Sequence, residues 1–398
     1  MDITIHPSPL RGTVTAIPSK SQVHRLLICA AFADAPTTLL CPETNRDIEA
    51  TADCLRSLGA EILRTEQGYL INPISNIPES ATLHCGESGS TLRFLLPIVG
   101  ALGVDGTFRM EGRLPQRPLS PLWEEMERKG CQLSHPTENT LRCQGKLRSG
   151  NYRIRGDVSS QFITGLLLAL SRVSGSSTVE ALGTLESKPY VDMTLQAMKI
   201  FGVACENFQI HGGQTFHSPG TVIVEGDWSN AAFFLAAGAL GSQIQMLGLD
   251  LKSAQGDKAV FHLLSDLEQQ TTISAKDIPD LIPILSVIAA AKRGAIFTDI
   301  ARLRLKESDR IASTIAMLRA LGGKAEATDN TLTVYPSDFT GGMVDPMNDH
   351  RIAMSAAIAA IVCKEDVTIR NAECVSKSYP KFFEEYRRLG GNYEQYLR

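Results

Sequence analysis

Basic side chains stand at the start of an apolar segment near the N-terminus, where they could bind an anion. The stretch IPSKSQVHRLL, residues 17–27, places Lys20 and Arg25 where an apolar run begins, with Ser19 or Ser21 as the expected N-cap of a helix. A helix N-terminus already carries about half a positive charge, so each cation there costs roughly 0.3–1 kcal/mol. A charge-assisted hydrogen bond to a bound anion contributes roughly 1.5–3 kcal/mol, which outweighs that cost. The stretch therefore predicts an anion site at a helix start.

Similar polar clusters precede other apolar segments of the chain. They are GESGSTLR with Arg93, VSSQ with Ser159, Ser160 and Gln161, IPD with Asp280, and NDHR with His350 and Arg351. Charged clusters also precede a second type of helix, namely GRLPQRP with Arg113 and Arg117, ESKPY with Ser187 and Tyr190, LKESDR with Lys306, Glu307 and Arg310, and SKSYP with Lys377. So many basic groups suit more than one anionic group, such as a phosphate and a carboxylate. Asp280 and Glu307 are carboxylates among cations, which suits them to general acid or base catalysis.

Each cluster also has a simpler structural interpretation. Serine and aspartate at a helix start are commonly caps, and a lone arginine commonly forms a surface ion pair. LKESDR could be an exposed helix face on which Lys306 and Arg310, four residues apart, share one side. The repeated placement of basic groups at equivalent helix starts favours a shared site over independent caps.

The spacing of these helix starts indicates an internal repeat. With Ser21, Ser90, Ser160, Asn230, Asp280 and Asp349 as markers, the intervals are 69, 70, 70, 50 and 69 residues. A second helix type ending in Leu-Gly or a variant lies between them, and alternating stretches such as NTLTVYP surround both. A fixed period indicates one structural unit used repeatedly. We expect three units in each of two similar domains, a crossover near residues 215–225, and a trimmed unit or junction near 230–280. Buried, parallel helices would then bring their N-termini together as one anion site.

The composition excludes some classes of protein. The 398 residues suffice for two or more domains, and the formal charge of −4 argues against a general nucleic-acid binder. The nine cysteines show neither C-x-x-C nor zinc spacing, which favours reduced thiols in the cytoplasm. MDITIHPSPLRG lacks the apolar core of a signal peptide, and the apolar runs 281–291 and 352–363 are shorter than the roughly 18 residues of a membrane span. We therefore expect neither export nor membrane insertion.

Eleven motifs in order carry a resemblance to a known family. They are PSKSQVHR, SGSTLR, GRLPQRP, VSSQF, ESKPY, EGDWS, QGD, IPD, LKESDR, NDHRIAM and SKSYP. Over nearly its whole length the chain resembles the 5-enolpyruvylshikimate-3-phosphate (EPSP) synthases, or 3-phosphoshikimate 1-carboxyvinyltransferases. The resemblance implies an α/β fold of two similar domains, each with three βαβαββ units around a pseudo-threefold axis, as in an inside-out α/β barrel. Residues 1–18 and 222–398 would form the domain mainly for phosphoenolpyruvate, residues 19–221 the domain mainly for shikimate 3-phosphate, with the active site in the cleft between.

The resemblance also implies a reaction, EC 2.5.1.19. The enolpyruvyl group of phosphoenolpyruvate would pass to the 5-hydroxyl of shikimate 3-phosphate with release of phosphate, in the shikimate pathway to chorismate and the aromatic amino acids. It implies no metal and no organic cofactor. We expect a cytoplasmic monomer whose partners are these two small molecules, without nucleic acid or membrane.

The family's functional residues carry over motif by motif. The catalytic set is Asp280, Glu307, Lys20, His350 and Lys377, with Asp280 placed to take the 5-hydroxyl proton and Glu307 or Lys20 to handle the proton at the methylene carbon. The set for shikimate 3-phosphate is Lys20, Ser21, Arg25, Ser159, Ser160, Gln161, Ser187, Tyr190, Asp280 and Lys306. The set for phosphoenolpyruvate is Lys20, Gly89, Arg113, Gln161, Arg310, Arg351 and Lys377.

Three positions depart from the family pattern, and no role is carried over to them. Glu87 stands where asparagine is usual, so its carboxylate must turn away from phosphoenolpyruvate or pair with a basic residue. His24 replaces a more usual asparagine, and Arg302 stands where some members have asparagine on the shikimate side.

Three other functions remain as alternatives. A UDP-N-acetylglucosamine enolpyruvyl transferase would carry a cysteine in the loop that here reads GRLPQRP, which has none. An RNA 3′-phosphate cyclase would need a histidine nucleophile and a surface for nucleic acid, which the net charge disfavours. A non-catalytic anion-binding scaffold would not need Asp280 and Glu307. Phosphate release with each acceptor separates these cases.

Overall fold

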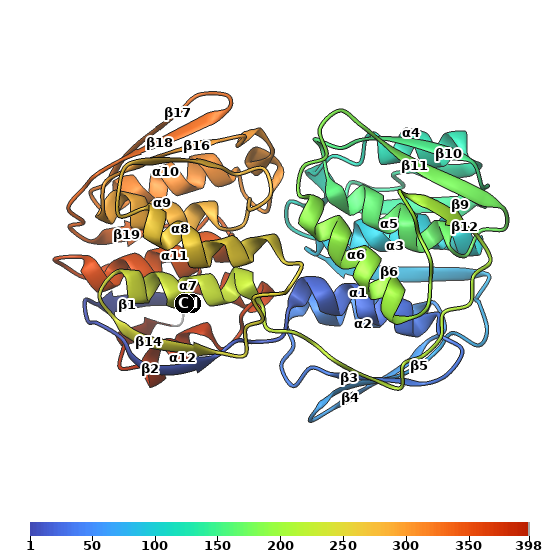
Figure 1. Ribbon diagram of the computed structural model, residues 1–398, viewed down its shortest axis with the longest axis horizontal. Helices are drawn as coiled ribbons and strands as arrows, with labels where there is room; N and C mark the ends of the chain where they lie inside the picture. The colour runs from blue at the N-terminus through green and yellow to red at the C-terminus, as the bar shows by residue number, and fades with distance from the viewer. Residues whose placement is uncertain (397–398) are drawn as a thin grey trace. The chain divides into compact units, whose positions relative to one another are not determined.

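The computed structural model describes residues 1–396, and the chain divides into two compact units. Unit 1 comprises Met1–Ile17 and Gly226–Arg398, and unit 2 comprises Pro18–Glu225. We expected the boundaries after residues 18 and 221, and the structure places them after residues 17 and 225. Each unit is a mixed α/β body with its own apolar core (Figure 1).

Unit 2 contains six α-helices and eleven strands among the described residues. Its helices are α1 (Lys20–Ala31), α2 (Arg46–Ser57), α3 (Gly89–Leu102), α4 (Leu122–Arg128), α5 (Ser160–Leu170) and α6 (Lys188–Ile200), with the 3₁₀ helix η1 (Leu114–Gln116). Its strands are β3 (Thr37–Leu40), β4 (Glu61–Thr65), β5 (Gly68–Asn72), β6 (Ser80–Gly86), β7 (Asp105–Met110), β8 (Cys131–Ser134), β9 (Thr140–Gly145), β10 (Asn151–Arg155), β11 (Ser176–Leu182), β12 (Gln209–His211) and β13 (Thr221–Ile223).

Unit 1 likewise contains six α-helices, with ten strands, in the part of the chain that the structure describes. Its helices are α7 (Trp228–Ala239), α8 (Val260–Asp266), α9 (Ile282–Ala291), α10 (Arg310–Ala320), α11 (His350–Ala359) and α12 (Phe382–Arg388), with the 3₁₀ helices η2 (Gly256–Ala259), η3 (Ala301–Leu305), η4 (Ala360–Val362) and η5 (Ala372–Lys377). Its strands are β1 (Asp2–His6), β2 (Arg11–Thr15), β14 (Gln243–Leu247), β15 (Thr271–Ser274), β16 (Ala295–Thr298), β17 (Lys324–Ala327), β18 (Thr331–Tyr335), β19 (Gly342–Val344), β20 (Val367–Ile369) and β21 (Asn392–Tyr396).

The predicted repeat is present as six small sheets, three in each unit. The order β6-β7-β9-β8 shows the pattern: β6 and β7 pair in parallel across α3, and β9 then runs antiparallel to both β7 and β8. The sheet β15-β16-β18-β17 of unit 1 has the same order and the same directions. The expected α/β fold of repeated units is therefore confirmed.

Three of the six sheets among the described residues join strands from distant parts of the sequence. Strand β13, at the end of unit 2, pairs in parallel with β3 near its beginning, and β1 pairs antiparallel with β20 and β21 at the other end of the chain. The third of these sheets pairs β2, from the N-terminal segment, in parallel with β14, which lies between α7 and α9, and it has no further strand in the described part of the chain. This two-stranded sheet is the trimmed unit that the short interval at residues 230–280 predicts.

The small-residue helices form the centre of each unit. Residues of α3, α5, α7, α9 and α11 are buried on nearly every side, because alanine, glycine and leucine allow close approach of neighbouring elements. Helix α3 packs on α5 in unit 2, whereas α7, α9 and α11 all pack on one another in unit 1. Serine or aspartate caps α1, α3, α5, α7 and α11, so the predicted polar clusters lie at true helix starts.

Candidate active site

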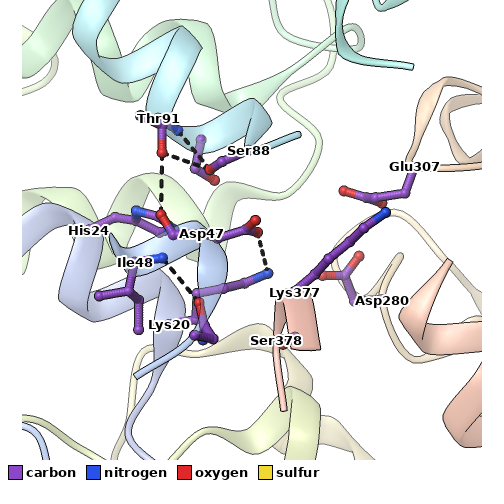
Figure 2. A network of polar contacts seen from close by, with 12 residues as sticks. Lys20, His24, Asp47, Ile48, Ser88, Thr91, Asp280, Glu307, Lys377 and Ser378 are labelled. Atoms are coloured by element: carbon purple, nitrogen blue, oxygen red, sulfur yellow. Dashed lines mark hydrogen bonds and ion pairs between the residues drawn. The ribbon is translucent and has the colours of Figure 1, made fainter. Parts of the chain in front are cut away.

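Helix α1 begins with an ion pair. Ser19 is the N-cap, and its side chain accepts a hydrogen bond from the backbone N–H of Gln22. Lys20 Nζ lies 2.9 Å from Asp47 Oδ2 in the first turn of α2, and both side chains are largely buried (Figure 2). The cation at this helix start is thus held by a carboxylate from the neighbouring helix.

Arg25 lies one turn further along α1 and is buried. Its Nε donates to Thr194 Oγ1 at 2.8 Å, Nη1 to the carbonyl of Ser21 at 2.6 Å, and Nη2 to the carbonyl of Tyr190 at 2.8 Å. Burial lowers the pKa of Arg25 to about 10, so the side chain stays charged at neutral pH. Arg25 therefore positions the backbone of two residues expected to bind shikimate 3-phosphate.

Two arginine side chains lie at the start of α3. Gly89 is its first residue, and a Cβ placed there would lie 2.7 Å from Arg117 Nη1 and 3.2 Å from Arg93 Nη1. Two guanidinium groups thus lie against the N-terminal turn of a fourteen-residue helix, where free N–H groups and the helix dipole favour an anion. A side chain at this position would push against the ends of these two arginine side chains.

Gln161 links the starts of α3 and α5. Its Oε1 accepts from Arg93 Nη1 at 2.7 Å, and its Nε2 donates to Ser90 Oγ at 2.9 Å. Ser159 caps α5 by accepting from the backbone N–H of Gln161, and Ser160 is buried in the first turn. The structure therefore brings the SGSTLR and VSSQ motifs together, as we predicted for an anion site.

Ser187 precedes α6 in a strained conformation. Its φ of 54° lies in the left-handed region, which is uncommon for a residue other than glycine, asparagine or aspartate and costs roughly 1–3 kcal/mol. Strain of this kind is often retained where a side chain must point in one direction for function. Ser187 and Tyr190 thus bracket the first turn of α6.

The two arginines of GRLPQRP differ in their placement. Arg113 is exposed and precedes η1, whereas Arg117 follows η1 and lies against Gly89. From the sequence, we noted Arg117 and Arg93 as members of polar clusters, and the resemblance assigned the binding of phosphoenolpyruvate to Arg113. The motif alone cannot distinguish its two arginines, because only the 3₁₀ turn between them decides which one reaches α3. The assignment to Arg113 stays a prediction.

Glu87 precedes the cap of α3. Its carboxylate packs against Gly112, where a Cβ would collide with the Oε2 atom. Gly112 has a φ of 55°, so this turn before Arg113 both requires glycine for its backbone and leaves the space that the carboxylate fills. The sequence left open which way Glu87 turns, and the structure turns it toward Gly112.

Arg310 is the centre of the ionic network in unit 1. It is the first residue of α10 and is almost fully buried. Nη1 lies 2.7 Å from Asp280 Oδ1, Nη2 lies 2.6 Å from Glu307 Oε2, and Nε lies 3.1 Å from Asp349 Oδ2. One guanidinium thus binds three carboxylates, among them both predicted proton-transfer groups.

Asp280 is surrounded by cations. Lys306 Nζ lies 3.5 Å from Oδ1, and Arg351 Nη2 lies 3.4 Å from Oδ2. Burial alone raises the pKa of Asp280, but the charges of Lys306, Arg351 and Arg310 outweigh it and hold that pKa well below the usual carboxyl range. Burial lowers the pKa of Lys306 to about 8, although Asp280 opposes this effect.

The interpretation of LKESDR as one helix face is wrong. Lys306 directly follows η3 and Arg310 begins α10, so residues 306–309 form the connection between two helices. Lys306 and Arg310 still act on a common partner, because both contact Asp280. The turn brings the charges together, and no shared helix face is needed.

His350 and Arg351 are the first two residues of α11. Asp349 caps this helix by accepting from the backbone N–H of Arg351 at 2.9 Å. Arg351 Nη1 donates to the carbonyl of Ser229 at 2.8 Å, and both His350 and Arg351 are buried. Lys377 ends η5 and is buried as well, with Nζ donating to the carbonyl of Asn348 at 2.7 Å.

Two further buried groups belong to unit 1. Arg302 donates to the carbonyl of Lys276 at 3.1 Å, which fixes it beside the Lys306 segment. Asp257, from the QGD motif, accepts a hydrogen bond from the Ser229 hydroxyl, and burial together with Asp280 raises its pKa to about 7. The sequence assigned no role to Asp257, and only its motif pointed to it.

Comparison with known proteins places the chain in a family. A family model for EPSP synthase (3-phosphoshikimate 1-carboxyvinyltransferase) matches residues 5–386. The 3-phosphoshikimate 1-carboxyvinyltransferase of Clostridium kluyveri is 39% identical over 99% of this chain and 98% of its own, and that of Clostridium perfringens is 39% identical over 98% of both.

Solved structures show the same fold. An EPSP synthase from Acinetobacter baumannii matches with a TM-score of 0.80 and 23% identity over 99% of both chains. The enolpyruvyl transferase NikO from Streptomyces tendae matches with a TM-score of 0.77 and 17% identity over 99% of this chain and 98% of its own. These likenesses show that the chain has the same fold of two α/β units.

The chain belongs to the EPSP synthase family, the 3-phosphoshikimate 1-carboxyvinyltransferases. It is a transferase of the shikimate pathway, which serves aromatic amino acid biosynthesis. Among residues 1–396, no helix has the length and apolar character needed to cross a membrane.

Proposed function

We propose that the residues of both units serve one reaction, the transfer of the enolpyruvyl group of phosphoenolpyruvate to the 5-hydroxyl of shikimate 3-phosphate. Protonation of the methylene carbon makes the neighbouring carbon electrophilic, and the 5-hydroxyl oxygen attacks it while losing its proton. The tetrahedral intermediate then loses phosphate and a methyl proton, which restores the double bond. The protein must hold two anions and move protons at two positions.

Asp280 is the base for the 5-hydroxyl proton. Arg310, Lys306 and Arg351 all contact its carboxylate, which keeps Asp280 ionised and makes it a weak base. Phosphate and carboxylate groups that draw on the same cations would weaken their hold on Asp280 and raise its pKa. Substrate binding thereby makes the base stronger when a proton must be taken.

Glu307 handles the proton at the methylene carbon, and Lys20 is the alternative. Glu307 shares Arg310 with Asp280, so the same redistribution of charge reaches both carboxylates. General acid or base catalysis of this kind contributes roughly 10²–10⁴-fold to a rate. Lys20 is held by Asp47 in unit 2 and has the charge needed to bind an anion.

The helix starts of unit 2 bind the anionic groups. Arg93 and Arg117 at Gly89 form a cradle suited to the carboxylate or phosphate of phosphoenolpyruvate. The polar groups around α5 and α6 suit a phosphorylated polyol, and they are Ser159, Ser160, Gln161, Ser187 and Tyr190. Arg25 holds Tyr190 and Ser21 in place from behind.

The observation that carries this proposal is the binding of Asp280, Glu307 and Asp349 by the single buried guanidinium of Arg310. The test is phosphate release from phosphoenolpyruvate with shikimate 3-phosphate as acceptor and with UDP-N-acetylglucosamine as the matched control. We expect release with the first acceptor only. Release with the second alone, or with neither, contradicts the proposal.

Each chain carries all of the residues that this proposal uses, so we also propose that the enzyme is active as a monomer. We further propose that it works in the cytoplasm. Light scattering at assay concentrations, with specific activity measured over a hundredfold dilution, tests the first point. A specific activity that falls with dilution contradicts it.

A further inference from the structure

His24 is a buried group that the proposed reaction does not use. Its ring lies edge-on to Phe94, with centroids 6.3 Å apart and an interplanar angle of 90°. Nδ1 lies 2.7 Å from Thr51 Oγ1, whereas Nε2 is buried without a hydrogen-bond partner. A polar ring is thus held in an apolar site by one hydrogen bond.

That hydrogen bond starts a chain of hydroxyl groups. Thr51 Oγ1 lies 2.7 Å from Thr91 Oγ1. Thr91 Oγ1 in turn lies 2.7 Å from Ser88 Oγ and 3.4 Å from the backbone carbonyl oxygen of Asp47 (Figure 2). Ser88 caps α3 by accepting from the backbone N–H of Thr91. This series of hydroxyl groups therefore joins the side of α1 to the first turn of α2 and to the start of α3.

The protonation state of His24 decides which group donates and which accepts along this series of hydrogen bonds. Burial, with the charges of Lys20 and Arg25, lowers the pKa of His24 well below its usual value, so the ring is neutral and has one N–H. A proton on Nε2 would bury a donor without an acceptor, at a cost of roughly 1–3 kcal/mol. Either tautomer leaves Nε2 unpaired, but an orphaned buried N–H is rarer than an orphaned acceptor, so we assign the proton to Nδ1, which donates to Thr51, while the Thr51 hydroxyl donates to Thr91.

Two parallel contacts join α1 to α2. Lys20 and His24 are four residues apart on α1 and contact Asp47 and Thr51, which are four residues apart on α2. Residues with this spacing lie on one face of a helix. The His24–Thr51 contact is thus the uncharged neighbour of the Lys20–Asp47 ion pair, and both fix the same pair of helix faces.

We propose that His24 is a positioning residue for Lys20, acting through Thr51 and Thr91 on the first turn of α2 and thereby on the carboxylate of Asp47. The proposal rests on the proposed function in that Lys20 serves the reaction. A protonated ring would not replace the neutral one, since the second charge would lie beside Lys20 and Arg25.

Three variants test this chain of contacts. His24→Leu removes the ring donor, Thr51→Val removes the next hydroxyl with little change of shape, and His24→Asn keeps an amide N–H near the position of Nδ1. We expect the first two to lower kcat/KM for phosphoenolpyruvate about tenfold, as a small displacement of a reacting group does, with a smaller rise in the dissociation constant for shikimate 3-phosphate, which other side chains also hold. His24→Asn should restore most of the loss, and the double variant His24→Leu/Thr51→Val should lose no more than either single variant.

A second readout is independent of turnover. Reductive methylation with formaldehyde, followed by mass spectrometry of the peptide containing Lys20, should be faster in His24→Leu and Thr51→Val than in the wild type. The matched control is Thr37→Val, which removes a buried hydroxyl bonded to Ser218 elsewhere in unit 2 and should change only stability. If His24→Leu does not fold, Thr51→Val carries the test alone.

The possible failures are distinguishable. A wild-type enzyme without turnover contradicts the proposed function but leaves the labelling experiment intact. Unchanged labelling of Lys20, additive losses in the double variant, or equal losses in the Thr37→Val control overturn the positioning role of His24.

Discussion

The two units hold their basic side chains in different ways. In unit 2, Arg25 and Arg93 donate to hydroxyl, carbonyl and amide oxygens, and only Lys20 is paired with a carboxylate among the contacts described above. In unit 1, Arg310 and Arg351 contact the carboxylates of Asp280, Glu307 and Asp349. The described partners of Arg25 and Arg93 are neutral oxygens, whereas those of Arg310 include three carboxylates. Under the proposed function, this difference suits unit 2 to anchoring anions and unit 1 to proton transfer.

The largest expected effect separates these two tasks. Glu307→Gln removes a proton-transfer group but keeps its shape, so kcat should fall roughly 10²–10⁴-fold while the binding of shikimate 3-phosphate stays nearly intact. Rapid-quench assays and calorimetric titration measure the two quantities. An equal loss of turnover and binding would place Glu307 among the anchoring groups and break the distinction.

Removal of one arginine from each unit compares the two environments directly. Arg310→Met leaves three carboxylates without their buried partner and should cost unit 1 about 3–5 kcal/mol. Arg25→Met leaves neutral oxygens and should cost unit 2 only about 1–3 kcal/mol.

The chain offers a separate fluorescent probe for each unit in this experiment. Trp123 lies in unit 2 and Trp228 in unit 1, so variants with a single tryptophan report the urea unfolding of one unit at a time. Equal losses in the free energy of unfolding for Arg310→Met and Arg25→Met at pH 7 would mean that carboxylate partners and neutral partners stabilise these arginines equally.

The anchoring role of unit 2 can be narrowed to one of two arginines. Arg117→Gln removes a charge from the cradle at Gly89 and should raise KM for phosphoenolpyruvate roughly 10–100-fold, the equivalent of one charge-assisted hydrogen bond. Arg113→Gln is the matched variant in the same loop, and its exposed position predicts the smaller rise. A larger rise in KM for Arg113→Gln than for Arg117→Gln would support the assignment of phosphoenolpyruvate binding to Arg113 that was made from the motif.

The smallest expected effect concerns pH. Because burial lowers the pKa of Lys306 to about 8, this side chain loses its charge as the pH rises through that value, and kcat/KM for shikimate 3-phosphate should decline with it. Burial lowers the pKa of Arg25 only to about 10, so this side chain keeps its charge over the same range. Lys306→Arg should remove the decline up to about pH 9, and a decline that persists in this variant would have another source.

The repeat was predictable because each helix start combines a polar cap with small apolar residues at a fixed interval. The intervals of 69 and 70 residues predicted full units, and the interval of 50 predicted the unit whose sheet has only β2 and β14. The partners of β1 and β13 were not predictable, because a strand's alternating pattern does not reveal which distant strand it joins.

The candidate site was predictable to the level of motifs. Asp280, Glu307 and Arg310 were placed together by their motifs, and the structure joins them through one guanidinium. The choice between Arg113 and Arg117 depended on a single 3₁₀ turn, and the inward position of Arg25 depended on the packing of α5 and α6. Such details arise from tertiary contacts, which no local pattern encodes.

The pairing of β1 with β20 and β21 dictates an order of events during synthesis. Residues 18–225 contain every strand of their own sheets, so unit 2 has all its partners once residue 225 has left the ribosome. Strand β1, in contrast, has no place to pair until residues 367–396 have been made. Its alternating Ile3 and Ile5 remain without a core for that time, which makes the N-terminal segment the part of the nascent chain most in need of a chaperone.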